Sequence, residues 1–248
     1  MALIYGRNPV IEAINSGTTI NKIYIQKSSK EFSDIYRLVK EKKIVIVETE
    51  KSKLDKMCNN RNSQGIVASI TDFKYCDIED IIELAKSRNE APFILILDKI
   101  EDPHNLGAII RTAECLGVHG VIIQKRNACQ ITDTVEKVAA GACLYMKVAR
   151  VANITESIKK LKDYGLWIYG LDMQGSSKIY ETKLEGAIGI VVGNEGTGIS
   201  RLVKENCDFM INIPMTGKIN SLNASVSAAI SIYEIVRQKN LFKTKNEV

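Results

Sequence analysis

The chain has 248 residues, 45% hydrophobic and 25% charged, a composition typical of a globular protein and not of a disordered or fibrous one. Its net charge is +5, its two histidines are too few for a histidine-based metal centre, and no apolar run approaches the roughly 20 residues that cross a bilayer. We therefore expect no metal site and no membrane contact, and a length sufficient for two modest domains, each with a real core.

The six cysteines show no regular spacing and no C-x-x-C pair. This pattern predicts free thiols in a reducing compartment and neither a disulfide framework nor a zinc site. The first residues enter a patterned segment directly, without the features of a signal or transit peptide. Together these observations predict a cytoplasmic protein.

The positive charge is concentrated in the first third of the chain. Residues 1–75 hold 13 Lys and Arg against 8 Asp and Glu, whereas residues 76–248 hold 21 of each. A basic segment joined to a neutral one indicates that the first part binds RNA or DNA electrostatically. A solvated, lysine-rich surface would give the same excess, so this alternative stays open.

The first third alternates strands with helices and predicts a small α/β domain. Asn8 has the character of a helix cap and Pro9 that of a first helical residue, with Gly17 ending the helix. The further elements expected here are strands at 22–26, 44–47 and 66–70, and helices at 31–42, 52–58 and 77–87. We assign residues 1–72 to this domain and residues 73–91 to a linker that holds the last of these helices.

Residues 92–248 predict a larger, doubly wound α/β domain with a mostly parallel sheet. The first strand, 93–98, is a continuous apolar run, as a parallel strand covered on both faces requires. The other strands expected are 118–124, 147–151, 166–171, 188–192 and 209–213, and the helices are 105–116, 132–142, 154–164 and 221–238.

Polar residues gather directly after three of these strands, in the segments 98–111, 193–198 and 213–225. Ligands of open parallel sheets bind beyond the carboxyl ends of the strands. The third segment joins a strand stopped by Pro214 to a glycine loop and a polar helix start, which suits a polar or charged ligand. An ordinary strand-to-helix turn capped by Ser221 would have the same pattern.

The second segment does not predict a nicotinamide site. Its Gly193-x-x-Gly-x-Gly order reverses the spacing of the dinucleotide fingerprint G-x-G-x-x-G, and it comes late in the domain. A nicotinamide-dependent oxidoreductase is therefore disfavoured.

The three segments contain Asp102-Pro-His-Asn-Leu-Gly-x3-Arg111, Val192-Gly-Asn-Glu-Gly196 and Ile213-Pro-Met-x-Gly-x3-Ser-Leu-Asn-x-Ser225. These resemble, in order, the three motifs of the SpoU/TrmH family of RNA 2′-O-methyltransferases, which belongs to the SPOUT class. The motifs span nearly the whole second domain, so the resemblance is specific. The Tyr5-Gly-Arg-Asn-Pro-Val-x-Glu-Ala opening and Gln64-Gly65 resemble the L30e-like substrate-binding domain of the subgroup that methylates a guanosine ribose in 23S rRNA.

The resemblance implies a trefoil knot in the second domain, a homodimer, and S-adenosylmethionine bound among the knot loops. The residues that it assigns to the cofactor are Gly193, Gly196, Ile213 and Leu222. Glycines let a backbone approach a ligand closely, and two apolar side chains can sandwich an adenine. Without the motifs, core packing would be the ordinary explanation for the two apolar residues.

The implied reaction moves a methyl group from a sulfonium to a ribose 2′-hydroxyl. The residues that the resemblance places at this chemistry are Asn105, Arg111, Glu195, Ser221 and Asn223. Arg111 is the residue that the family resemblance offers as the base, but a guanidinium hardly ever loses its proton. Arg111 could instead hold the RNA phosphate and polarise the hydroxyl. His104 has a suitable pKa for a base, or it only structures the turn.

Three alternatives stay open beside a guanosine of 23S rRNA as the target. The same chemistry could act on tRNA or on a ribosomal adenosine, and an inactive relative could serve as an RNA-binding assembly factor. The basic first domain favours rRNA, and the complete set of motif residues favours an enzyme.

Overall fold

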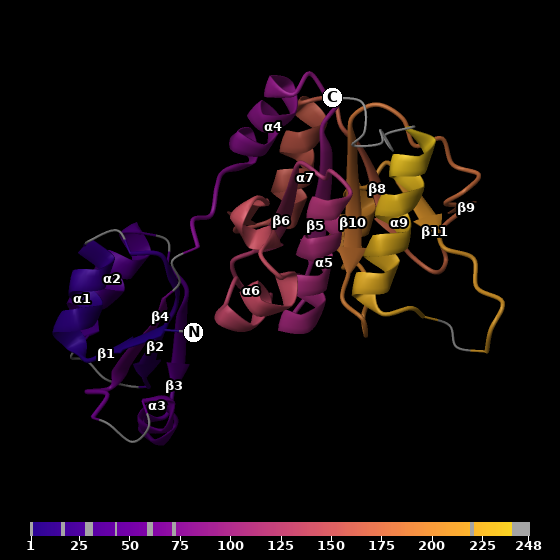
Figure 1. Cartoon of the computed structure of the whole chain (residues 1–248). Coiled ribbons are helices and arrows are strands. Elements are labelled where there is room, and N and C mark those ends of the chain that lie inside the picture. The colour runs from indigo at the N-terminus through magenta and orange to yellow at the C-terminus, as the bar shows by residue number, and fades with distance from the viewer. Residues whose placement is uncertain are drawn as a thin grey trace. The chain divides into compact units, whose positions relative to one another are not determined.

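The computed structural model of the chain describes residues 2–15, 18–27, 32–42, 44–58, 62–70, 73–218 and 221–239. The chain divides into two compact units: the first comprises residues 1–74 together with the short segment 131–133, and the second comprises the remainder of the chain. Figure 1 labels the elements of both. Gly17 and Glu31, expected to end the first helix and to begin the second, lie outside the described residues.

The first unit is a four-stranded sheet with three helices. Its elements are β1 (Ala2–Tyr5), α1 (Arg7–Asn15), β2 (Ile20–Gln26), α2 (Ser33–Glu41), β3 (Ile46–Thr49), α3 (Lys51–Met57) and β4 (Ile66–Ile70). The strand order is β1-β4-β2-β3, in which β4 runs antiparallel to both neighbours and β2 and β3 are parallel. The small α/β domain expected from the sequence is present.

The start of this unit differs from the expectation. The first four described residues form β1, and Gly6, at φ +91°, turns the chain into a helix that begins at Arg7. Asn8 is therefore inside the helix and is not its cap. The Arg7 backbone N–H instead donates to Oε1 of Gln64 at 3.1 Å, so a distant side chain satisfies this helix start.

The second unit holds the larger sheet. Its first elements are α4 (Ile78–Ser87), β5 (Phe93–Asp98), α5 (Pro103–Cys115), β6 (Gly120–Gln124), α6 (Asp133–Ala139), a short 3₁₀ helix (Ala142–Leu144), β7 (Lys147–Val151) and α7 (Ile154–Asp163). It continues with β8 (Trp167–Leu171), β9 (Ser177–Lys178), β10 (Ile188–Gly193), α8 (Arg201–Asn206), β11 (Phe209–Asn212) and α9 (Ala224–Gln238).

The seven strands are ordered β7-β6-β5-β10-β8-β11-β9, and every pairing is parallel. The mostly parallel sheet expected from the sequence is thus confirmed. The two-residue edge strand β9 was not expected, because so short a segment has no detectable alternation. The trefoil knot implied by the resemblance stays a prediction.

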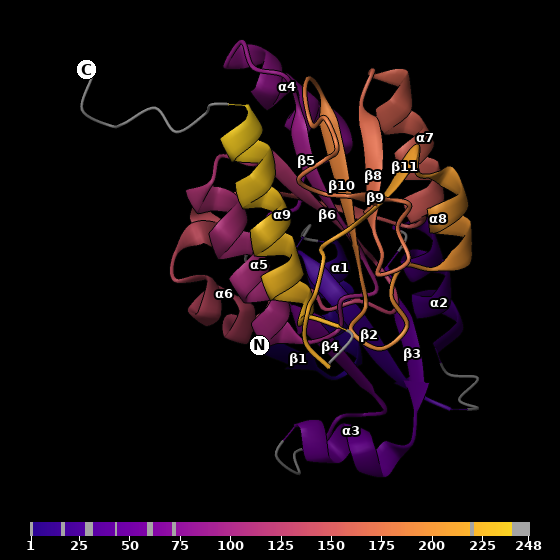
Figure 2. The ribbon, with the colours of Figure 1, turned by 90° about the vertical axis from the view of Figure 1, so that its right-hand side faces the viewer.

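Helices cover both faces of this sheet. Ile94 and Ile96 of β5 pack in one core cluster with residues of α4, α7 and α8. Since side chains alternate along a strand, the buried Leu95 and Leu97 point to the opposite face, which α5 and α9 cover. Figure 2 shows α5, α6 and α9 on one side of the sheet and α7 and α8 on the other.

Helix α4 lies in the segment 73–91 that the sequence assigned to a linker. Its Ile78, Ile81 and Ile82 are buried in the core of the second unit. Ile81 also fills the space where a side chain at Gly120 would lie, with Cδ1 2.5 Å from an added Cβ. This helix is therefore an integral part of the second unit.

Two helices of the second unit begin at other residues than expected. Asp102 caps α5 by accepting from the His104 N–H at 2.8 Å, with Pro103 as the first helical residue, so the helix starts before Asn105. Asn223, and not Ser221, caps α9, because its Oδ1 accepts from the Ser225 N–H at 2.9 Å.

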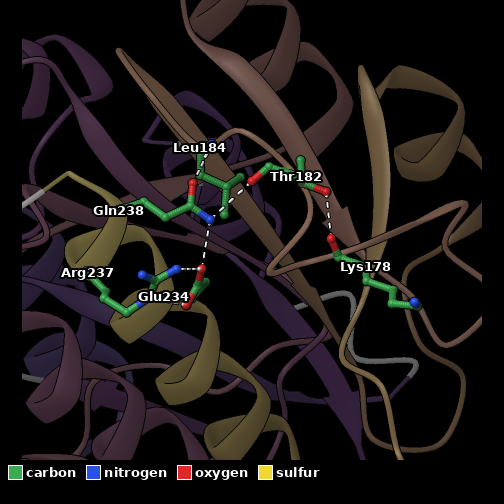
Figure 3. Close-up of polar contacts among 6 residues, drawn as sticks. All are labelled: Lys178, Thr182, Leu184, Glu234, Arg237 and Gln238. Carbon is green, nitrogen blue, oxygen red and sulfur yellow. Dashed lines mark hydrogen bonds and ion pairs between the residues drawn. The ribbon is translucent and has the colours of Figure 1, made fainter.

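The last turn of α9 clamps the chain segment between β8 and β10 (Figure 3). Gln238 accepts from the Leu184 N–H at 2.9 Å through Oε1, and its Nε2 donates to the Thr182 carbonyl at 3.1 Å. Nε2 also donates to Glu234, and Arg237 donates two further hydrogen bonds to the Glu234 carboxylate. The helix thus holds both its own end and the neighbouring segment in place.

The six cysteines all lie in the described part and are free thiols. Burial raises the pKa of Cys76 and Cys143 to about 11 and that of Cys207 to about 12, so these thiols stay protonated at neutral pH. Among the described residues, the helices lack the length and apolarity that spanning a bilayer requires.

Candidate functional site

A cavity of about 300 Å³ lies at the carboxyl ends of β8, β10 and β11. Parallel strands bring these ends to the same edge of the sheet, which is where such folds bind ligands. Its lining residues come from four places: 171–174 after β8, 192–198 after β10, Lys204 of α8, and Ile213, Met215, Ser221, Leu222, Ala224 and Ser227 around the start of α9. All four residues expected at the cofactor, Gly193, Gly196, Ile213 and Leu222, line this cavity.

The loop after β10 closes on itself beside the cavity. The Gly198 N–H donates to the Asn194 carbonyl at 2.9 Å, and the Asn194 N–H donates back to the Gly198 carbonyl at 3.2 Å. A Cβ on Gly193 would lie 2.2 Å from the Gly198 carbonyl carbon, so no side chain fits there. A Cβ on Gly196 would meet only Asn194 Oδ1, at 3.4 Å. The loop therefore requires a glycine at 193 and not at 196.

Three of the residues expected at the chemistry form a hydrogen-bonded row. Asn105 donates through Nδ2 to Glu195, and its Oδ1 accepts from Asn223 Nδ2 at 2.9 Å. The three residues come from the three separate sequence motifs, and Asn105 at their centre is buried. The row holds the exposed Glu195, a lining residue, at the cavity.

Asn223 has two roles in this arrangement. Its Oδ1 caps α9, while its Nδ2 donates to Asn105. Ser221 lines the cavity and takes no part in the cap. Asn223 is thus a cap that also joins the row, whereas Ser221, the cap expected from the sequence, is a residue at the cavity.

Arg111 is not part of this row. It is exposed, it does not line the cavity, and it has no hydrogen bond or ion pair with the described residues. Six positions separate it from Asn105, so the two side chains leave α5 in directions about 120° apart. His104 lies seven positions from Arg111 and shares its exposed face of α5.

The carboxyl end of β8 also contributes to the cavity, which was not expected from the sequence. Asp172, Met173 and Gln174 line the cavity there, and Lys204 of α8 lines it beside Asp172. Lys204 forms an ion pair with Asp172. Burial alone would raise the pKa of Asp172, but the hydrogen bond from Lys204 and one from the Gln174 N–H at 2.8 Å outweigh it and lower the pKa. An acidic residue directly after a buried parallel strand was the signal available in the sequence.

The lining fits a nucleoside that carries a charged tail. Apolar side chains such as Ile213 and Leu222 can pack against a base, and the glycine loop offers backbone groups. Asp172, Glu195 and Lys204 add charges of both signs. In the described parts of the chain, no group of three or more His, Cys, Asp or Glu residues could hold a metal ion.

The all-parallel sheet carries a ligand cavity at its strand ends, and the row of Glu195, Asn105 and Asn223 joins the three polar motifs beside it, as expected for a methyltransferase of the SPOUT class. The chain belongs to the SpoU rRNA methylase family, whose family model matches residues 92–233. A second model, for the RNA 2′-O ribose methyltransferase substrate-binding domain, matches residues 3–76. The family resemblance of the sequence is confirmed.

Relatives match the chain over nearly its full length. A Staphylococcus saprophyticus protein assigned to the TrmH family of tRNA/rRNA methyltransferases is 45% identical over 245 residues, 98% of each chain. YacO of Bacillus subtilis, assigned to the same family, is 39% identical over 239 residues, 96% of each chain.

Solved structures share the fold. The SpoU methyltransferase AviRb of Streptomyces viridochromogenes, in complex with AdoMet, is 23% identical with a TM-score of 0.61, over 96% of this chain and 90% of that one. The A. aeolicus TrmH/SpoU tRNA modifying enzyme is 27% identical with a TM-score of 0.56, over 66% of this chain and 84% of that one.

Proposed function

We propose that this chain transfers a methyl group from S-adenosylmethionine to a ribose 2′-hydroxyl of RNA, and that the target is a guanosine in 23S rRNA. The observation that carries the proposal is the row Glu195–Asn105–Asn223, which unites the three family motifs beside a cavity suited to a nucleoside. The row brings three polar side chains together beside the cavity, where they can act on a ligand in addition to stabilising the fold.

The cavity residues hold the cofactor. When bound, S-adenosylmethionine supplies a methyl group made electrophilic by its sulfonium. Ile213 and Leu222 pack against its adenine, and the loop from Gly193 to Gly196 presents backbone groups to its polar atoms. These interactions fix the position of the reactive end relative to Glu195 and Ser221.

The catalytic residues orient the ribose. The Glu195 carboxylate, held by Asn105, accepts a hydrogen bond from the 2′-hydroxyl and takes its proton as the oxygen receives the methyl group, and Ser221 contacts the same substrate. Asn223 holds Asn105 in register. Arg111 contributes positive charge to the RNA phosphate and does not act as the base, because it is exposed and does not line the cavity.

Ribosomal RNA is the substrate favoured by the domain content. The first domain matches a substrate-binding domain and carries all of the chain's excess positive charge. The tRNA modifying enzyme of A. aeolicus aligns with only 66% of this chain, whereas relatives assigned to tRNA or rRNA align with nearly all of it. A tRNA or a ribosomal adenosine is the second candidate, since the relatives are assigned to tRNA or rRNA and the motifs do not select the nucleotide.

The functional unit that we propose is a homodimer formed through α9. Val226 and Ile230 lie one turn apart on its outer face, and these residues are 44% and 38% exposed. Tyr233, 52% exposed, continues this stripe, and apolar stripes of this kind mark interfaces. Size-exclusion chromatography with light scattering tests this: Ile230→Lys is expected to give monomers where the unaltered protein gives dimers.

The experiment that tests the function is methyl transfer in vitro with tritiated S-adenosylmethionine. The full-length protein should label 23S rRNA purified from a strain that lacks this gene, and it should label rRNA from the parent strain far less. Mapping of ribose methylation in both strains then identifies the nucleotide. Labelling of tRNA alone would favour the second candidate, and an unchanged methylation profile at every site would refute the enzyme proposal.

A further inference from the structure

Two residues that line the cavity, Asp172 and Lys204, form an ion pair. Asp172 directly follows β8, and Lys204 lies on α8. The Asp172 side chain is 15% exposed and that of Lys204 is 38% exposed. Neither residue belongs to the three family motifs, and the row of Glu195, Asn105 and Asn223 does not include them.

The described lining contains three charged residues, and they differ in the partners that hold them. They are Asp172, Glu195 and Lys204, so Lys204 is the sole cation among the described lining residues. Glu195 is held by Asn105 at the catalytic row. The Asp172–Lys204 pair is therefore the part of the lining available to a ligand that carries both a positive and a negative group.

We propose that Asp172 and Lys204 bind the amino-acid end of S-adenosylmethionine, with the Lys204 ammonium on the α-carboxylate and the Asp172 carboxylate on the α-ammonium. The inference rests on the proposed function, which supplies the cofactor. It assigns specificity for the complete cofactor, as opposed to its nucleoside part, to two side chains outside the motifs.

Electrostatics favour this arrangement over an uncharged wall. The α-carboxylate and α-ammonium of the ligand are adjacent, and the side-chain charges of Asp172 and Lys204 are also adjacent. Four charges that alternate in sign stabilise one another, whereas a lone buried charge would pay a desolvation penalty. With the cavity empty the two side chains neutralise each other, so the site is organised before the ligand binds.

Calorimetric titration of the full-length protein with two ligands tests the assignment. S-Adenosylhomocysteine carries the amino-acid end, and 5′-methylthioadenosine lacks it. Lys204→Met is expected to weaken binding of the first about tenfold or more, the loss typical of a charged hydrogen bond, and binding of the second less than about twofold. Lys204→Arg, which keeps the charge, should restore most of the affinity. Arg201→Met is the matched control, because Arg201 lies on the same helix and pairs with Glu205 outside the cavity.

Equal weakening of both ligands by Lys204→Met, or no weakening of either, would overturn the inference. If that variant fails to fold, the unaltered protein still tests the inference. It must bind S-adenosylhomocysteine about tenfold or more tightly than 5′-methylthioadenosine, which lacks the amino-acid end. An unaltered protein that binds neither S-adenosylhomocysteine nor 5′-methylthioadenosine would refute the proposed function itself, which is a distinguishable result.

Discussion

Asn223 donates a hydrogen bond from Nδ2 to Oδ1 of Asn105 at 2.9 Å, across 118 positions of sequence. The bond joins the start of α9 to the first turn of α5, the two helices that pack together on one face of the sheet. Because Asn105 is buried and also donates to Glu195, it can satisfy both neighbours only in this orientation. The position of Glu195 at the cavity therefore depends on both helices.

Replacing Asn105 separates this positioning role from cofactor binding. Asn105→Ala removes the donor to Glu195 and the acceptor for Asn223, but Asn105 is not itself a lining residue, and the residues assigned to the cofactor keep their side chains. We expect turnover to fall about a hundredfold, as when one positioned hydrogen-bond donor is lost from an active site. Cofactor affinity, measured by calorimetry, should stay within about threefold. A parallel loss of affinity and turnover would contradict the role.

Asn223 and Asn153 offer a matched pair of helix caps. Asn153 caps α7 through a hydrogen bond from the Thr155 N–H at 2.9 Å, and the structure gives it no role at the cavity. Alanine at either position should destabilise the protein by about 1 kcal/mol in chemical denaturation. Only Asn223→Ala is expected to lower methyl transfer, by about tenfold or more, because it also releases Asn105. Equal methyl-transfer activity of the two variants would show that Asn223 only caps α9 and does not contribute to catalysis.

The two glycines of the loop after β10 should respond differently to alanine. At Gly193 the added carbon would overlap the backbone of Gly198, so the loop must open and cofactor binding should be lost. At Gly196 the nearest atom is 3.4 Å away, and we expect affinity within about threefold of the unaltered protein. Calorimetry with S-adenosylhomocysteine measures both. A strong loss at Gly196 would indicate that the added methyl group itself collides with the bound ligand.

The sequence predicted the segments of the site better than their internal geometry. Strand 93–98 and the three polar segments were evident because parallel strands are continuous apolar runs that end at ligand sites. The helix starts were misplaced because Asn105 and Ser221 have the residue types of caps, and only tertiary contacts decide which residue caps. Asp172 and Lys204 were missed because their pairing joins elements whose adjacency the sequence does not reveal.

Acid should destabilise the second unit through His119. This residue is buried, its Nδ1 accepts from the Phe93 N–H at 3.0 Å, and its Nε2 lies 3.0 Å from Glu90. Burial lowers its pKa below the usual 6.5, and the hydrogen bond with Glu90 opposes this only in part. Below about pH 6.5 the unfolded chain therefore binds the proton first, and stability falls as the pH decreases; above that value His119 adds no pH dependence.

The His119→Asn variant checks this origin of the acid sensitivity. Asparagine keeps an acceptor for the Phe93 N–H but cannot take up the proton. Thermal unfolding between pH 5 and about pH 8 should show a smaller decrease toward acid for the variant than for the unaltered protein. Identical slopes would assign the sensitivity to other groups.

The clamp formed by Gln238 links the stability of α9 to the segment that carries part of the cavity. Gln238→Leu leaves the N–H of the fully buried Leu184 without its acceptor, which should cost about 1–3 kcal/mol. For a chain of this size, each kcal/mol corresponds to roughly 2–4 °C in the unfolding midpoint. Lys183→Leu is the control, since Lys183 is on the same segment, 78% exposed, and its pair with Glu185 should contribute less than about 1 kcal/mol. Because the clamped segment begins at Asp172, Gln238→Leu should also lower the affinity of the protein for S-adenosylhomocysteine more than Lys183→Leu does. Equal affinities of the two variants would show that the clamp stabilises α9 without shaping the cavity.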